Sequence, residues 1–178
     1  MIRLVTGGAR SGKSKFAESL FVDYQDVCYI ATARIEDAEM RQRVALHRAM
    51  RSSIWRTYEG TYDLAQAIGS ERHYLLDCLT VLTSNIMFDM AGEQERIDQN
   101  LMQQIEDRVM REVFSLIHSV RDCNGKLTIV TNEVGMSIVP EHHISRVFRD
   151  IQGRVNQRVA DLCDEVYLIV VGQKVRVK

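Results

Sequence analysis

A glycine-rich motif near the start of the chain constrains the fold more than any other feature. Residues Gly7 to Ser14 read Gly-Gly-Ala-Arg-Ser-Gly-Lys-Ser, a full match to G-x-x-x-x-G-K-[ST]. An apolar, strand-like run, Ile2 to Thr6, precedes the match, and a helix-like stretch begins at Lys13. This strand–loop–helix context is the one in which such a loop binds phosphate through inward-pointing backbone N–H groups. The alternative is a plain glycine-rich turn that matches by chance.

The rest of the chain alternates short apolar runs with longer helix-like stretches, which predicts an α/β fold with a mostly parallel sheet flanked by helices. The runs are almost continuously apolar, as expected for strands covered on both faces. The predicted strands are Ile2–Thr6, Val27–Ala31, Tyr74–Leu76, Leu127–Thr131 and Val166–Val171, with a short edge strand in Gly172–Lys178. The predicted helices are Lys13–Phe21, Asp37–Met50, Tyr62–Ile68, Thr80–Met90, Glu95–Val120 and Pro140–Leu162.

Composition and charge exclude several classes of protein. The chain has 178 residues, no linker-like segment and no repeat, so we expect one domain over residues 1–178. A formal net charge of −1 gives no basic field for nucleic acid or a membrane surface. Four scattered cysteines favour reduced thiols, and no apolar run is long enough to span a bilayer. With no signal peptide expected before the first strand, we predict a cytoplasmic protein.

Three residues are expected to act on the phosphates and their metal ion. Lys13 would contact the β- and γ-phosphates, and the Ser14 hydroxyl would bind Mg²⁺. Asp77 ends the strand-like run before it and suits the second, acidic Mg²⁺ position. The alternative for Asp77 is a cap on the helix that starts near Thr80.

With these residues located, the sequence resembles the bifunctional adenosylcobinamide kinase/adenosylcobinamide-phosphate guanylyltransferase family over essentially its whole length. The phosphate-binding motif is generic, but the other blocks in combination are specific to the family. The specific blocks are His47–Arg51, Thr131–Gly135 and Phe148–Ile151. The whole resemblance rests on Val5–Ser14, Ile30–Thr32, His47–Arg51 with Trp55, Thr57 and Glu59, Leu76–Thr80, Thr131–Met136, Ile138–Glu141 and Phe148–Arg158.

The resemblance implies a P-loop fold of the RecA-like kind, assembled as a homotrimer. It also implies two reactions. The aminopropanol hydroxyl of adenosylcobinamide is phosphorylated with ATP or GTP. GMP is then transferred from GTP through a guanylylated histidine, giving adenosylcobinamide-GDP and pyrophosphate.

The resemblance assigns the guanylylated histidine to His47. From the residues alone, Arg43 and Arg51 lie four positions to either side, on one helix face if the helix extends that far. Two such cations would keep the imidazole neutral and nucleophilic, although a solvated helix face explains the same pattern. The nucleotide-contacting residues expected from the motif and the resemblance are Gly7, Gly8, Ala9, Arg10, Ser11, Gly12, Lys13, Ser14, Thr32, Ala33, Arg34, Arg48, Ala49, Met50, Arg51, Glu59 and Asp77.

Two further groups of residues leave alternatives open. Asn132 and Glu133 follow a predicted strand, where they have either a substrate- or phosphate-sensing role or a structural one. His142 and His143 are adjacent and suit a metal site poorly. At the level of function, the alternatives are a P-loop small-molecule kinase with one activity and a nucleotide-gated binding module.

Overall fold

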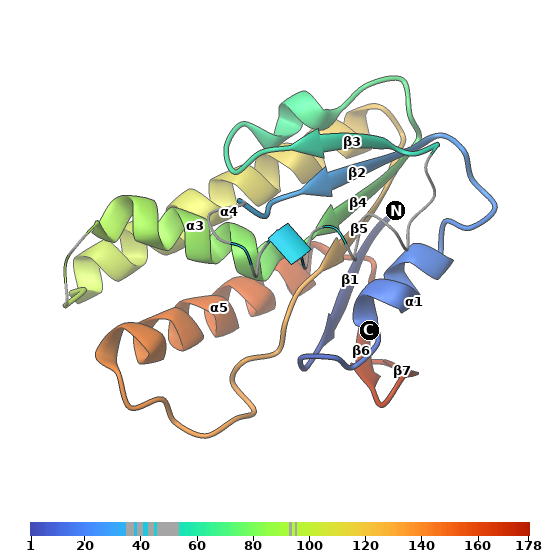
Figure 1. The fold of residues 1–178 in the computed structure, drawn as a ribbon. Helices are drawn as coiled ribbons and strands as arrows, with labels where there is room; N and C mark the ends of the chain where they lie inside the picture. Colours follow the sequence, from blue (N-terminus) through green and yellow to red (C-terminus); the bar gives the residue numbers. More distant parts are fainter. Residues whose placement is uncertain (35–37, 39–40, 43–44, 46–53, 93, 95) are drawn as a thin grey trace.

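The computed structural model describes residues 1–34, 38, 41–42, 45, 54–92, 94 and 96–178. Its central feature is a seven-stranded sheet in the order β3-β2-β4-β5-β1-β6-β7 (Figure 1). All neighbouring strands run parallel except β7, which pairs with β6 in the antiparallel direction. The strands are β1 (Ile2–Gly7), β2 (Val27–Ala31), β3 (Arg56–Glu59), β4 (His73–Asp77), β5 (Lys126–Val130), β6 (Glu165–Val170) and β7 (Gln173–Arg176).

Helices cover both faces of this sheet, as the apolar strands predicted. In Figure 1, α1 lies on one side of the sheet and α3, α4 and α5 lie on the other. The helical elements are α1 (Lys13–Ser19), the 3-10 helix η1 (Leu64–Ala67), α3 (Leu79–Ala91), α4 (Gln99–Asp122) and α5 (His143–Leu162).

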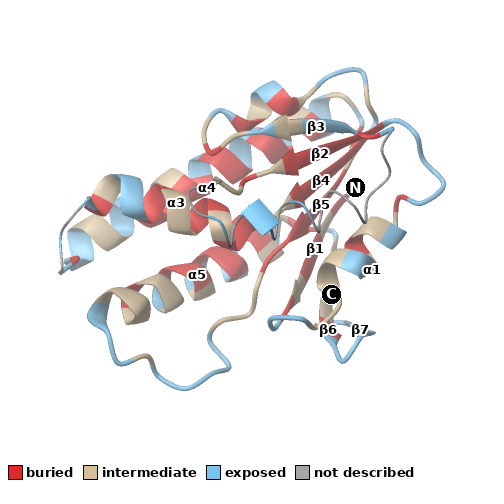
Figure 2. Cartoon of the chain, in the orientation of Figure 1, coloured by how far each residue is buried: buried red, intermediate tan, exposed pale blue. Residues whose placement is uncertain are grey.

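The core divides into two layers because side chains alternate along each strand. In β4, Tyr74 and Leu76 pack with α3, α4 and α5, whereas Leu75 packs with the layer that contains α1. In β1, Leu4 belongs to the first layer and Val5 to the second. Figure 2 shows the buried strands at the centre of the molecule, between the inner faces of the helices. The continuous apolar runs in the sequence therefore reflect burial on both faces of the sheet.

Three sequence-based boundaries are corrected by the structure. The predicted helix over Tyr62–Ile68 is only the 3-10 turn η1. The helix predicted from Pro140 begins at His143, and residues 131–142 are a loop. The helix predicted from Glu95 begins at Gln99, where the Asp98 side chain accepts a 2.8 Å hydrogen bond from Leu101 N and caps the helix.

The sequence did not predict the strand β3. β3 pairs with β2 at the edge of the sheet, and three of its four residues are exposed. Its sequence, Arg-Thr-Tyr-Glu, therefore has no apolar run to reveal it, which is common for an edge strand. Of the predicted helix over Asp37–Met50, the structure describes residues 38, 41, 42 and 45, which are helical. Within the described ranges, no helix has the length and apolar character needed to cross a membrane.

Candidate functional site

The G-x-x-x-x-G-K-S motif forms a loop between β1 and α1, as its context predicted. β1 ends at Gly7 and α1 begins at Lys13. Gly12 has φ 96°, in the region that favours glycine, and Arg10 also has a positive φ of 57°. The loop is closed by a hydrogen bond of 3.3 Å from Ser11 N to Gly8 O. The result is a tight backbone curl at a helix start, which suits a bound phosphate.

Two other segments hold this loop in place. Gly7 O accepts a 3.1 Å hydrogen bond from the N–H of Glu133, just after β5. Ser11 O accepts a 2.8 Å hydrogen bond from the N–H of Gly172, in the turn between β6 and β7. A Cβ atom on Gly12 would lie 3.3 Å from Gly172 Cα, so the two backbones leave little room for a side chain there. The shape of the loop therefore depends on two distant parts of the chain.

Lys13 and Asp77 lie close enough to influence each other electrostatically. Burial lowers the pKa of the Lys13 ammonium, and the neighbouring Cys78 and Asp77 side chains act in the opposite direction. Lys13 Nζ donates to Gly8 O at 3.2 Å, while Tyr29 Oη donates to Asp77 Oδ2 at 2.8 Å. The N-cap position of α3 is Cys78, so Asp77 lies one residue before the cap. Its effect on Lys13 places the Asp77 side chain near the start of α1, at the end of β4.

The residues present suit a magnesium ion that is shared with phosphate. The described parts of the chain contain no group of three or more His, Cys, Asp or Glu side chains that could hold a metal by themselves. Mg²⁺ commonly takes only one or two protein oxygens and completes its shell with phosphate and water. Ser14 at the start of α1 and Asp77 at the end of β4 are oxygen donors of this kind. They fit a metal ion that arrives with a nucleotide.

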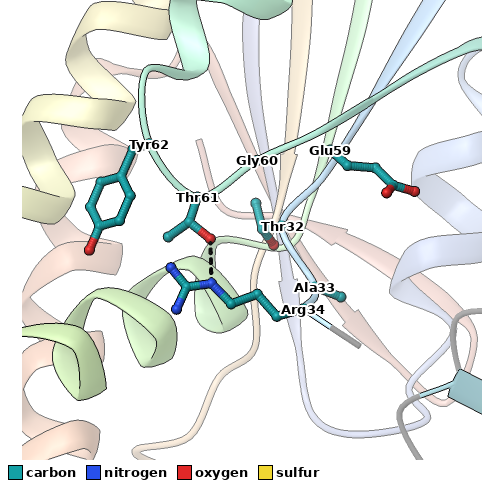
Figure 3. Close-up of a pocket in the computed structure, with 7 residues that line it drawn as sticks. All are labelled: Thr32, Ala33, Arg34, Glu59, Gly60, Thr61 and Tyr62. Atoms are coloured by element: carbon teal, nitrogen blue, oxygen red, sulfur yellow. Dashed lines mark hydrogen bonds between the residues drawn. The ribbon is translucent and has the colours of Figure 1, made fainter. Parts of the chain in front are cut away.

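A cavity of about 310 Å³ lies at the carboxyl ends of β2 and β3, at the same end of the sheet as the phosphate-binding loop (Figure 3). It is lined by Thr32, Ala33, Arg34, Glu59, Gly60, Thr61 and Tyr62. Four of the predicted nucleotide-contacting residues, from the ends of β2 and β3, are therefore brought together here. Since β1, β5, β4 and β2 are successive neighbours, three strand spacings, about 14 Å, separate β2 from β1. The cavity and the phosphate-binding loop are thus two separate regions along the carboxyl ends of the strands.

Hydrogen bonds fix the walls of this cavity. The Thr32 hydroxyl donates to Cys78 O at 2.9 Å and accepts from Cys78 N at 3.0 Å, which ties the end of β2 to the end of β4. Arg34 Nε donates to the Thr61 hydroxyl at 3.1 Å, as Figure 3 shows. Asn85 Nδ2, from α3, donates to Thr32 O at 2.8 Å. Arg34 thus lies within a network that joins two loops and a helix.

Residues 3–177 match the family described as cobinamide kinase / cobinamide phosphate guanyltransferase. This chain belongs to that family. The family resemblance noted in the sequence is confirmed. The enzyme is therefore a cobinamide kinase and a cobinamide phosphate guanylyltransferase, with nucleotides as substrates.

Curated relatives are similar over their full or nearly full length. The chain is 44% identical to the bifunctional adenosylcobalamin biosynthesis protein CobU of Escherichia coli K12, covering 100% of both chains. It is 45% identical to the protein of the same name from Salmonella typhimurium LT2, again over 100% of both. It is 36% identical to the bifunctional adenosylcobalamin biosynthesis protein CobP of Pseudomonas aeruginosa, over 95% of this chain and 92% of that one.

A solved structure supports the P-loop fold of this family member. A prototypical ATPase from the type III secretion system of pathogenic bacteria has a TM-score of 0.56 to this chain. The likeness covers 94% of this chain, and the chain spans about half, 51%, of that ATPase chain. Because only 10% of residues are identical, the likeness concerns the fold alone.

The other residues singled out in the sequence are the predicted site residues around His47 and the two adjacent histidines His142 and His143. His47, Arg48, Ala49, Met50 and Arg51 lie outside the described residues, as does Arg43. His142 is the exposed N-cap residue of α5, and His143 Nε2 lies 3.3 Å from Ile97 O. The two adjacent histidines therefore do not form a common site within the described structure.

Sequence reasoning missed three residues of the cavity and two supporting contacts. Gly60, Thr61 and Tyr62 follow β3, which carried no apolar signal of its own. Tyr29 and Gly172 support Asp77 and the phosphate-binding loop from elements distant in sequence. Because β3 is mostly exposed, its sequence gives no signal of its pairing with β2. Gly172, in contrast, stands before a polar strand and is a typical signal of a turn.

Proposed function

We propose that one domain, residues 1–178, carries out both reactions at the carboxyl ends of the strands of its sheet. In the first, the aminopropanol hydroxyl of adenosylcobinamide is phosphorylated with ATP or GTP at the Gly7–Ser14 loop. In the second, GMP passes from GTP to the resulting phosphate through His47. The observation that carries the proposal is the formed phosphate-binding loop, with a half-buried Lys13 facing Asp77.

The kinase step uses the residues at the start of α1. The backbone N–H groups of the loop bind the phosphates, and the Lys13 ammonium offsets the negative charge of the β- and γ-phosphates. The substrate hydroxyl oxygen bonds to the γ-phosphorus, and the bond between the γ-phosphorus and its bridging oxygen breaks, so ADP or GDP leaves. Mg²⁺ bound by Ser14 and Asp77 would supply charge neutralisation of the phosphates.

The guanylyl step requires a nucleophile that a simple kinase lacks. A neutral His47 nitrogen would attack the α-phosphorus of GTP, and pyrophosphate would leave. An oxygen of the substrate phosphate would then attack the same phosphorus, and the imidazole would leave. The arginines Arg48 and Arg51 suit a triphosphate because guanidinium groups bind phosphate oxygens in pairs. The cavity at Arg34 and Glu59 supplies a second nucleotide-contacting region for this step, supported by its convergence of predicted residues.

Labelled nucleotides test this proposal directly. The wild-type protein and His47→Ala are incubated with α-labelled GTP, and separately with γ-labelled ATP and adenosylcobinamide. The variant should lose the acid-labile, base-stable protein–GMP adduct and the guanylylated product, and it should keep measurable phosphorylation of adenosylcobinamide. His142→Ala is the matched control and should retain both.

Two outcomes would contradict the assignment. Label retained on His47→Ala would move the nucleophile to another residue, with His142 or His143 next in line. A wild-type protein that phosphorylates adenosylcobinamide without ever forming the adduct would favour a kinase with one activity. For the assembly we propose a cytoplasmic homotrimer, as the family resemblance implies, and light scattering during gel filtration measures its mass.

A further inference from the structure

Four buried polar side chains form a cluster where the start of α3 and the end of β5 meet α5. They are Thr80, Thr131, Gln152 and Asn156, and all four are at most 9% exposed. We refer to these four residues as the amide cluster. Gln152 Nε2 donates to Thr131 Oγ1 at 3.1 Å and to Asn156 Oδ1 at 2.8 Å. Thr131 Oγ1 donates to Asn156 Oδ1 at 2.8 Å and lies 3.2 Å from Thr80 Oγ1.

The amide cluster holds the backbone just after β5 from both sides. Asn132 N donates to Thr80 Oγ1 at 2.7 Å, and Asn132 O accepts from Asn156 Nδ2 at 3.1 Å. The next residue, Glu133, donates its own N–H to Gly7 O at 3.1 Å. Buried hydrogen bonds rigidify the groups they join, and the bonds to Asn132 N and O are of this kind, although Gln152 Oε1 has no partner in the described structure. What the amide cluster binds here is the peptide that precedes Glu133.

The strand order places Glu133 beside the phosphate-binding loop. β5 is the direct neighbour of β1, with Val130 opposite Val5, so the chain leaves β5 next to Gly7. Asp77 ends β4, one strand farther away, and Glu59 ends β3, at the edge of the sheet. Glu133 is half-buried, and its Oε1 accepts a 2.7 Å hydrogen bond from Gly135 N. Of these three acidic residues, Glu133 is the one that follows the direct neighbour of β1, and its backbone N–H contacts the loop at Gly7 O.

We propose that Glu133 is the catalytic base of the kinase step, and that the amide cluster is its positioning device. The Glu133 carboxylate takes the proton of the substrate hydroxyl as the hydroxyl oxygen bonds to the γ-phosphorus. The bond to the bridging oxygen breaks, and the nucleoside diphosphate leaves with that electron pair. The proposal rests on the function proposed above for the Gly7–Ser14 loop.

The two reactions of the enzyme should depend on Glu133 to different degrees. The kinase acceptor is a neutral hydroxyl, which must lose a proton. The guanylyl acceptor is a phosphate oxygen, which is already ionised near neutral pH and needs no base. Removing the base should therefore slow the first reaction selectively.

Glu133→Gln tests this with little change in shape. The kinase step is assayed with ATP and cobinamide, and the guanylyl step with GTP and cobinamide phosphate supplied from outside. We expect the kinase kcat of Glu133→Gln to fall about 100-fold or more, the size of effect typical of a general base. The KM for ATP and the rate of guanylyl transfer should stay close to wild type. Glu141→Gln, an exposed glutamate of the same loop, is the matched control and should change neither reaction.

Positioning by the amide cluster is tested at Thr80. Thr80→Val keeps the shape of the side chain but removes the oxygen that accepts from Asn132 N. The kinase kcat should fall while the KM for ATP stays close to wild type, and Thr80→Ser should restore kcat. A merely structural role would lower thermal stability without this separation of kcat from KM.

Several results would overturn the proposal. An unchanged kinase kcat in Glu133→Gln would remove its role as a base, and equal loss of both reactions would make it a general nucleotide contact. In Thr80→Val, unchanged kcat would remove the positioning role. If the function proposed for the Gly7–Ser14 loop is wrong, the result is different, because Lys13→Ala would then retain the kinase reaction.

Discussion

Arg34 and Asp89 form an ion pair with two hydrogen bonds, in which Arg34 Nη1 and Nη2 each donate at 2.6 Å to a different carboxylate oxygen. The Tyr62 hydroxyl donates to Asp89 Oδ2 at 2.7 Å. The Arg34 hydrogen bonds keep the pKa of the Asp89 carboxyl below its ordinary value. This pair joins the loop after β2 to α3 at the cavity, and it engages a guanidinium that is expected to contact nucleotide.

Asp89→Asn should therefore strengthen nucleotide binding. The amide retains the shape of the carboxylate but carries no charge, so Arg34 loses the anion that competes with phosphate. We expect the KM for GTP in guanylyl transfer to fall about 2- to 5-fold, because an ion pair this exposed is worth less than about 1 kcal/mol. Initial-rate kinetics measure it, with the exposed Asp122→Asn on α4 as control. A higher KM would mean that Asp89 orients Arg34 for nucleotide.

Lys13→Ala should abolish both reactions and leave the fold intact. Lys13 is half-buried at the phosphate-binding loop, and its ammonium donates to Gly8 O of the loop itself, so its loss removes charge stabilisation rather than core packing. We expect kcat to fall about 100-fold or more in each reaction. Lys15→Ala, an exposed lysine on the same helix, should behave as wild type in rate and melting temperature. Near wild-type kinase turnover in Lys13→Ala would disprove the phosphate-binding role of this loop.

Asp77→Asn should weaken the dependence of the kinase step on Mg²⁺. Asn can still accept the hydrogen bond from Tyr29, so the fold should change little while one negative charge is lost. Because Mg²⁺ prefers anionic oxygens, half-maximal activity should require more Mg²⁺ and kcat should fall about 10-fold or more. A Mg²⁺ titration of the initial rate measures this, with the exposed Asp23→Asn as control. If the titration curves superimpose, Asp77 has no role at the metal.

Glu71→Gln should destabilise the protein near neutral pH but not in acid. Glu71 receives hydrogen bonds from Arg56 Nε at 2.5 Å and Nη2 at 3.0 Å, which anchor the edge strand β3. These bonds lower the pKa of the Glu71 carboxyl below its ordinary value of 4.5. The stabilisation is therefore present above pH 4.5 and is lost as pH falls through the lowered pKa of the folded state.

Urea unfolding at several pH values measures this difference. Because Arg56 is partly exposed, we expect a cost of about 1 kcal/mol at pH 7. The difference from wild type should shrink as the pH falls from 4.5 through the lowered pKa of the folded state. Glu141→Gln, at an exposed position, should show no such pH-dependent difference. A cost that does not vary with pH would indicate a packing effect instead of the ion pair.

The phosphate-binding loop and the buried strands could be predicted because their signals are local. Gly12 and Lys13 are constrained by backbone conformation and helix start, which neighbouring residues determine. Strands such as β4 are apolar because they are buried on both faces, so burial is visible in the sequence itself. The family blocks indicated the function for the same reason, since each is a short stretch whose residue pattern can be recognised in the sequence alone.

The edge strand, the cavity and the support of the loop were decided only by the tertiary structure. Glu59 and Thr32 line one cavity because β3 pairs with β2, and an exposed strand gives no apolar signal of that pairing. The Glu133 backbone N–H contacts Gly7 O because β5, distant in sequence, is the strand inserted beside β1. Strand order depends on how helices pack on both faces of the sheet, a sum of long-range contacts that no local pattern encodes. The sequence thus predicted which residues bind phosphate, and the fold determined that Glu133 follows the strand beside them.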